Sequence, residues 1–253
     1  MSVFNLIIAG FAAFVAGIIN SVAGGGTLIT FPILTALGLP VVVANITNTV
    51  ALCPGYLSGT LAQKNDLAGL KNRLLILIPL SIFGGVLGGI ILIYTGDKNF
   101  RIIVPYLILM ASMLLAFQNK IKGWIASRGK RNNEEMLQKS VVILLILLAA
   151  VYGGYFGAGA SIVIFALLAL LYNDSLIRLN ALKQALAFSI NVSAAIYFCF
   201  SGKVCWKTAL IMAIGAIIGG RAGGKLSTKM KPNVLRWTVV IIGIAVASYY
   251  FII

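Results

Sequence analysis

Apolar runs, separated by short polar or glycine-rich stretches, occupy nearly the whole chain. They cover residues 3–19, 28–43, 44–61, 74–95, 102–117, 140–156, 160–172, 176–200, 208–226 and 234–253. A helix needs about 20 apolar residues to cross a bilayer, and several of these runs are shorter. The pattern predicts an all-α polytopic membrane protein with about 8–10 membrane segments, including glycine-broken short helices or re-entrant hairpins.

The first interruption is the stretch Asn20-Ser21-Val22-Ala23-Gly24-Gly25-Gly26-Thr27. Each glycine costs about 1 kcal/mol relative to alanine inside a helix. At membrane depth, backbone without helical hydrogen bonds is tolerated only where protein or a wet cavity satisfies it. The interruption therefore predicts either a discontinuous helix at a substrate site or a tight turn at a close helix crossing, and these residues alone leave both open.

The two halves of the chain repeat their glycine clusters in the same order. Residues 84–89 (GGVLGG) and 219–224 (GGRAGG) are 135 positions apart, and residues 24–27 and 157–160 are 133 positions apart. Ser58-Gly59 and Ser201-Gly202 are 143 positions apart. The matches predict a first transmembrane repeat at 1–117, a linker at 118–139 and a second transmembrane repeat at 140–253.

Charge is scarce and concentrated in short connections. The chain is 60% hydrophobic and 10% charged, with a formal net charge of +15, whereas soluble domains carry about 25% charged residues. Basic residues gather at 62–73, 118–139 and 225–236, and the positive-inside rule places these connections in the cytoplasm. We therefore interpret the charge as a topology signal and expect no nucleic-acid partner.

The three basic connections lie on the same side of the membrane if each half crosses the membrane an odd number of times. The halves would then be inverted relative to each other, as in many transporters. An eight-pass arrangement with re-entrant hairpins fits the lengths of the runs better, but it puts the 225–236 cluster outside. We expect the inverted repeats.

The residue types present exclude several kinds of chemistry. The chain has no histidine, and its three cysteines show no CxxC spacing, so we expect no metal site and no cofactor. A Ser-His-Asp arrangement cannot form, and we expect no enzyme. The five acidic residues lie outside the interior of the apolar runs, which argues against a carboxylate or histidine proton relay. A sodium site built from carbonyl and hydroxyl oxygens is still compatible with the sequence.

Neutral hydrogen-bonding side chains gather beside both glycine interruptions, and Lys183 and Arg221 lie inside apolar runs. Such groups at helix N-termini favour a dehydrated anion site. The alternatives are interhelical hydrogen bonds for the polar clusters, an interfacial position for Lys183 and snorkelling for Arg221. The candidate substrate-binding residues are Asn20, Ser21, Gly24, Gly25, Gly26, Thr27, Thr47, Asn48, Gly157, Gly159, Ser161, Lys183, Gln184, Asn191 and Arg221.

Over nearly its whole length, the chain resembles the TauE/SafE family of sulfite exporters, which are bacterial inner-membrane permeases. The resemblance rests on residues 20–27, Pro32, residues 44–49 (ANITNT) and residues 154–159 (GYFGAG). It implies a multi-pass inner-membrane location and movement of sulfite, organosulfonates or related anions, usually outward. The family often has a proline after the second glycine cluster, where Phe165 or Ala166 stands in this chain. We therefore expect a less kinked second break.

Together these features predict a transmembrane exporter of small sulfur-containing anions such as sulfite or organosulfonates. Alternating access would take place around a midplane site between the repeats. A passive anion channel and a non-transporting membrane scaffold are the alternatives. The expected partners are a small inorganic or organic anion and the lipid bilayer, and a homo-oligomer is left open.

Overall fold

Helices account for the architecture of the described part of the chain, residues 2–22, 25–127, 139–226 and 232–252 of a computed structural model. No β-strand occurs in these ranges. In chain order the elements are α1 (Val3–Val22), α2 (Thr27–Ala36), α3 (Val41–Ala62), the 3-10 turn η1 (Lys64–Leu67), α4 (Lys71–Ser127), α5 (Lys139–Tyr155), α6 (Ala160–Leu171), α7 (Leu176–Phe200), α8 (Trp206–Leu226) and α9 (Pro232–Ile252).

Four of the described helices contain segments long and apolar enough to cross a membrane. These segments are Val3–Asn20, Val41–Leu61, Lys71–Ile121 and Leu176–Phe200. Large apolar side chains such as Phe4, Phe11 and Phe200 are exposed on the helix surfaces, as expected for side chains that face lipid. The predicted all-α polytopic membrane protein is confirmed.

One helix boundary differs from the prediction. The turn between α2 and α3 lies at Leu37–Pro40, with Gly38 at φ 91° and Pro40 as the N-cap of α3, so the predicted boundary after residue 43 is wrong. Proline suits this position because it lacks a backbone N–H and cannot continue a helix. The runs 74–95 and 102–117 form the two parts of α4, and the break at Gly96, with φ 66°, lies between them as predicted.

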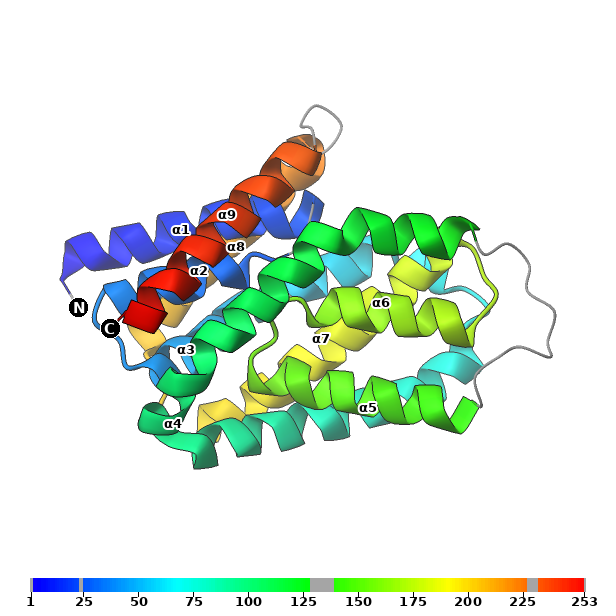
Figure 1. Cartoon of the computed structure of the whole chain (residues 1–253), viewed down its shortest axis with the longest axis horizontal. Helices are drawn as coiled ribbons and strands as arrows, with labels where there is room; N and C mark the ends of the chain where they lie inside the picture. Colours follow the sequence, from blue (N-terminus) through cyan, green and yellow to red (C-terminus); the bar gives the residue numbers. More distant parts are fainter. Residues whose placement is uncertain (1, 23–24, 128–138, 227–231, 253) are drawn as a thin grey trace.

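Both halves of the chain have the same order of elements. Each starts with a hairpin, α1–α2 or α5–α6, in which a long helix meets a short one across a glycine break. Three long segments follow: α3 and the two parts of α4 in the first half, and α7, α8 and α9 in the second. Both termini lie at one end of the molecule, whereas the end of α4 and the start of α5 lie at the other (Figure 1).

The glycine clusters line the crossings between the halves. The most extensive helix pairs are α1 with α8 and α4 with α5, so the first helix of each half packs on the other half. A Cβ atom on Gly17 would lie 2.8 Å from the Gly220 nitrogen, and one on Gly88 would lie 2.7 Å from the Tyr155 nitrogen. Such close approach needs glycine, because side chains would hold the backbones apart.

Candidate functional site

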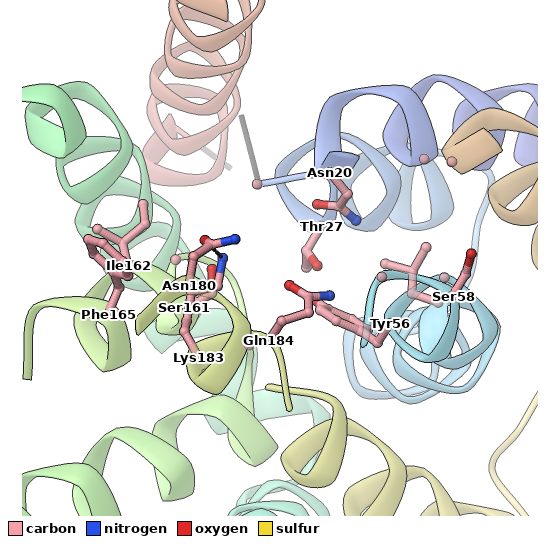
Figure 2. A pocket seen from close by; sticks show the side chains of 18 of the residues that line it. Asn20, Thr27, Tyr56, Ser58, Ser161, Ile162, Phe165, Asn180, Lys183 and Gln184 are labelled. Carbon is pink, nitrogen blue, oxygen red and sulfur yellow. Dashed lines mark hydrogen bonds between the residues drawn. The ribbon is translucent and has the colours of Figure 1, made fainter. Parts of the chain in front are cut away.

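A cavity of about 690 Å³ lies where the two glycine breaks approach each other. This volume is in the range of small-molecule sites in proteins. Asn20 and Thr27 of the first hairpin face Asn180 and Lys183 across it, with Gln184 between them (Figure 2). The polar side chains that line it are Asn20, Thr27, Tyr56, Ser58, Gln63, Gln118, Ser161, Asn180, Lys183 and Gln184.

The first break brings the N-terminus of α2 to the cavity. Gly25 has φ 91°, a conformation that favours glycine because it has no Cβ. The Gly26 N–H donates to Asn20 Oδ1 at 2.8 Å, and the Leu28 N–H donates to the Gly25 carbonyl at 3.0 Å. Asn20 therefore fixes the turn with its carbonyl oxygen.

The second break brings the N-terminus of α6 to the same cavity. Gly157 and Gly159 have φ 81° and 75°, and the Tyr152 hydroxyl donates to the Ala158 carbonyl between them. The chain therefore reverses between α5 and α6 without a proline in α6 (Figure 1). The two positive-φ glycines make this turn, and Phe165 lies within α6 beyond it.

Two short helices thus direct their N-termini at one cavity. Neither α2 nor α6 has a side-chain hydrogen bond at its N-cap. A helix N-terminus carries about half a positive charge, and its N–H groups favour anions. The arrangement favours a negatively charged ligand.

Lys183 is anchored in a short polar network at the cavity wall. Its Nζ donates to Asn180 Oδ1 at 3.0 Å, and Asn180 Nδ2 donates to Gln63 Oε1 at 2.8 Å. The network connects α7 to the end of α3. Lys183 is half-buried, so its positive charge is only partly screened by solvent. Among the described residues that line the cavity, none is acidic.

The cavity brings together part of the predicted site: Asn20, Gly25, Thr27, Gly157, Gly159, Ser161, Lys183 and Gln184. It does not include Gly26, Thr47, Asn48, Asn191 or Arg221. Gly24 lies outside the described residues, and Ser21 lies in the last turn of α1.

Several predicted residues have other surroundings. Thr47 is buried, and its Oγ1 accepts a hydrogen bond from the Cys205 N–H at 3.1 Å. Asn191 Nδ2 donates to the Ala187 carbonyl one turn earlier at 2.8 Å. Arg221 is exposed on α8. The Thr47 bond joins α3 to the residue before α8, whereas the Asn191 bond lies within α7.

Sequence reasoning identified Asn48 on α3 but missed Tyr56 and Gln63, which belong to the same polar stripe of the helix. Tyr56 and Gln63 line the cavity, and Asn48 and Asn45 continue the same helix face at spacings of three or four residues, together with Leu52. This spacing is visible in the sequence.

The stripe ends at two buried asparagines. Asn45 and Asn48 are each 1% exposed, and their Oδ1 atoms have no hydrogen-bond partner in the described part of the chain. Asn45 Nδ2 donates to the Tyr155 carbonyl at 2.8 Å. Unsatisfied buried acceptors are costly, so this polar face extends beyond the cavity at an energetic cost.

Aromatic rings pack beside Asn45, between the cavity and the end that holds the termini. The Phe31 and Phe156 ring centroids are 5.4 Å apart, and those of Phe100 and Tyr155 are 5.5 Å apart. Phe31, Phe100 and Phe156 are buried. The cluster connects both hairpins to α4.

The chain is similar to known membrane proteins. A model of the family described as Sulfite exporter TauE/SafE matches residues 9–250. Probable membrane transporter protein YfcA of Escherichia coli K12 is 27% identical, over 94% of this chain and 86% of that protein. Probable membrane transporter protein ORF9 of Sinorhizobium sp is 28% identical, over 93% and 88%. A probable membrane transporter protein of Haemophilus influenzae Rd is 27% identical, over 90% and 87%. No solved structure matches at a significant level.

Proposed function

The chain belongs to the sulfite exporter TauE/SafE family and is a membrane transporter, and from this we propose that it exports small sulfur-containing anions such as sulfite or organosulfonates. The observation that carries the proposal is the cavity where the α2 and α6 N-termini meet Lys183. Backbone N–H groups, neutral amides and an ammonium group match the oxygen atoms of such an anion.

The proposed site consists of the predicted residues that line the cavity, together with Gln118 and Asn180. Thr27, Ser161 and Gln184 supply hydroxyl and amide donors, and Lys183 supplies positive charge. In a cavity of low dielectric this charge acts more strongly on an anion than it would in water.

We propose that access alternates between two inverted repeats. The cavity reaches the end of the molecule where α3 ends and α7 begins, through Gln63 and Ile177. Lys64, Lys71 and Arg73 lie at this end, so the positive-inside rule makes it cytoplasmic, in a bacterial inner membrane. The cluster of Phe31, Phe100 and Phe156 would close the outer side in this state. Rocking of one half against the other would open that side.

A blocked cavity tests the proposal. Gly55 lines the cavity, and a Cβ placed on it meets no atom within 4 Å, so Gly55→Leu adds an isobutyl group to free space. Gly123→Leu is the matched control, because Gly123 also has open space around its Cβ position and does not line the cavity. We expect sulfite or a sulfonate to raise the Tm of the wild type and of Gly123→Leu, and to have little effect on Gly55→Leu.

The ligand screen should include sulfite, sulfate, taurine-like sulfonates and carboxylates. Stabilisation by the sulfur-containing anions supports the assignment, since ligands that bind the folded state raise its stability. If none of these anions shifts the wild-type Tm, or if Gly55→Leu responds like the wild type, the cavity is not the substrate site.

A further inference from the structure

A buried guanidinium lies close to the first break, outside the set of residues that line the cavity. Arg236 belongs by sequence to the basic cluster 225–236, which the charge pattern places in a cytoplasmic loop. The structure places Arg236 inside α9 with only 7% of its surface exposed. Its burial distinguishes it from Arg221, which is exposed on α8.

The buried charge of Arg236 is incompletely satisfied. Neither Nε nor Nη1 has a hydrogen-bond partner in the described ranges of the chain. The guanidinium carbon lies 5.8 Å from the centroid of the Trp237 ring, near the outer limit of a cation–π contact. Burial of a charge is costly unless it is paired and hydrogen-bonded, so this arrangement is suited to binding an anion.

Helix register places Arg236 beside the first break. Gly243 of α9 packs on Ser112 of α4, and the Cβ position of Gly25 is 3.1 Å from Leu115 Cδ2 and 3.6 Å from Val239 Cγ1. The two helices therefore run antiparallel, with position 239 level with position 115.

One further turn brings Arg236 to the level of Gln118, which lines the cavity. Arg236 thus lies on α9 one turn from Val239, the residue of α9 that approaches Gly25 of the first break. Lys183 lines the cavity from α7, across from the first hairpin (Figure 2).

We propose that Arg236 binds an oxyanion at the first glycine break and supplies the positive charge on that side of the site. This deepens the proposed function and rests on it. The planar guanidinium presents parallel N–H groups, which pair with two oxygen atoms of one anion. The ligand is therefore a small oxyanion with at least two free oxygens: the sulfur oxyanion itself, or the phosphate of an anionic lipid headgroup.

The test compares Arg236→Gln and Arg236→Lys with the wild type and with Arg101→Gln. Arg101 is an exposed arginine of α4 near the opposite end. Sulfite and methanesulfonate binding would be measured on purified protein in neutral detergent. We expect Arg236→Gln to weaken binding at least about tenfold, as when a buried hydrogen-bonded charge loses its partner. Arg236→Lys should fall between the wild type and Arg236→Gln, and Arg101→Gln should bind like the wild type.

The Tm without ligand separates binding from a structural role. An unpaired buried charge destabilises the empty protein, so Arg236→Gln should melt at the same or a higher temperature than the wild type. A lower ligand-free Tm would overturn the proposal, and so would an unchanged affinity for both anions together with an unchanged response to phosphatidylglycerol.

Adding phosphatidylglycerol or phosphatidylcholine to the purified protein and measuring the Tm distinguishes a lipid ligand from a soluble one. If only phosphatidylglycerol stabilises the wild type, and Arg236→Gln abolishes that effect, the bound oxyanion is a lipid phosphate. Soluble anions could bind through Arg236 without any of them crossing a liposome membrane. That result would contradict the proposed transport function and would still support anion binding by Arg236. If neither source stabilises the wild type, the assignment is wrong.

Discussion

Lys183 lies in the polar network that joins α7 to α3 at the cavity wall. Lys183→Ala should lower affinity for a sulfur oxyanion about 10–100-fold, because hydrogen bonds to charged groups are worth about 1.5–3 kcal/mol. The protein should remain monodisperse, since Lys183 is only half-buried. Lys207→Ala is the control, because Lys207 is exposed on α8 at the far end. Isothermal titration checks both variants, and unchanged affinity would remove Lys183 from the site.

Asp174 holds together the loops at the end that we assign to the cytoplasm. Its Oδ2 accepts from Arg73 Nη1 at 2.6 Å, and its Oδ1 accepts from the Ser175 N–H at 2.8 Å. Arg178 also pairs with it, at 3.5 Å. Burial by itself raises the pKa of Asp174, but the Ser175 N–H and the two arginines more than offset this and hold it below the ordinary value of 3.8.

A carboxylate with a lowered folded-state pKa stabilises the protein above its unfolded pKa, and this contribution is lost as the pH falls through the folded value. Asp174→Asn should therefore cost about 1–2 kcal/mol at neutral pH, a modest figure because both arginines are partly exposed. The difference in Tm between wild type and variant should shrink as the pH drops below 3.8. A difference that stays constant or grows on acidification would contradict the role of the ion pairs.

Helical phase explains why individual site residues were hard to place from the sequence. Thr47 and Tyr56 both belong to α3, but Thr47 bonds to Cys205 whereas Tyr56 lines the cavity. The order of elements in the repeat predicts which helices lie near the cavity. Which side chains line it depends on the face that each helix turns toward it. Arg236 was placed in a loop because its neighbours are basic, and only the packing of α9 shows its burial.

At the scale of elements, the glycine-lined crossings hold the two halves together. A Cβ on Gly219 would lie within 3 Å of Phe14 backbone atoms, whereas a Cβ on the adjacent Gly220 would meet nothing within 4 Å. Gly219→Ala should destabilise the protein by about 1–3 kcal/mol through overpacking. Gly220→Ala should be neutral, or stabilising by up to about 1 kcal/mol through helix propensity. Equal melting temperatures for the two variants would contradict this packing.

The elements themselves could largely be predicted, since apolar runs and glycine breaks mark them. The turn at Leu37–Pro40 was misplaced although Gly38 and Pro40 signal it, because the apolar run continues through it to residue 43. The pairing of α1 with α8 could not be predicted from a single sequence, since a glycine cluster does not specify which backbone it approaches.

At the scale of the molecule, we propose two interlocked inverted repeats, based on the order of elements and the pairings α1–α8 and α4–α5. Lys64 and Lys98 lie before and after the first long part of α4 and are both exposed. They should therefore lie on opposite sides of the membrane.

Single cysteines at these positions, in a background without Cys53, Cys199 and Cys205, test the topology. An impermeant maleimide should label Lys98→Cys in intact cells, and should label Lys64→Cys only after permeabilisation. Labelling of both cysteines from the same side would refute the arrangement.

The most direct test of the central claim is uptake of radiolabelled sulfite or a simple sulfonate into proteoliposomes of the purified protein. A transporter with one site between two repeats predicts saturable uptake that is accelerated by unlabelled anion on the opposite side. Gly55→Leu should reduce that uptake, and Gly123→Leu should leave it unchanged. Flux that rises linearly with concentration and shows no counterflow would identify a passive channel. Absence of flux in either direction would contradict transport of these anions altogether.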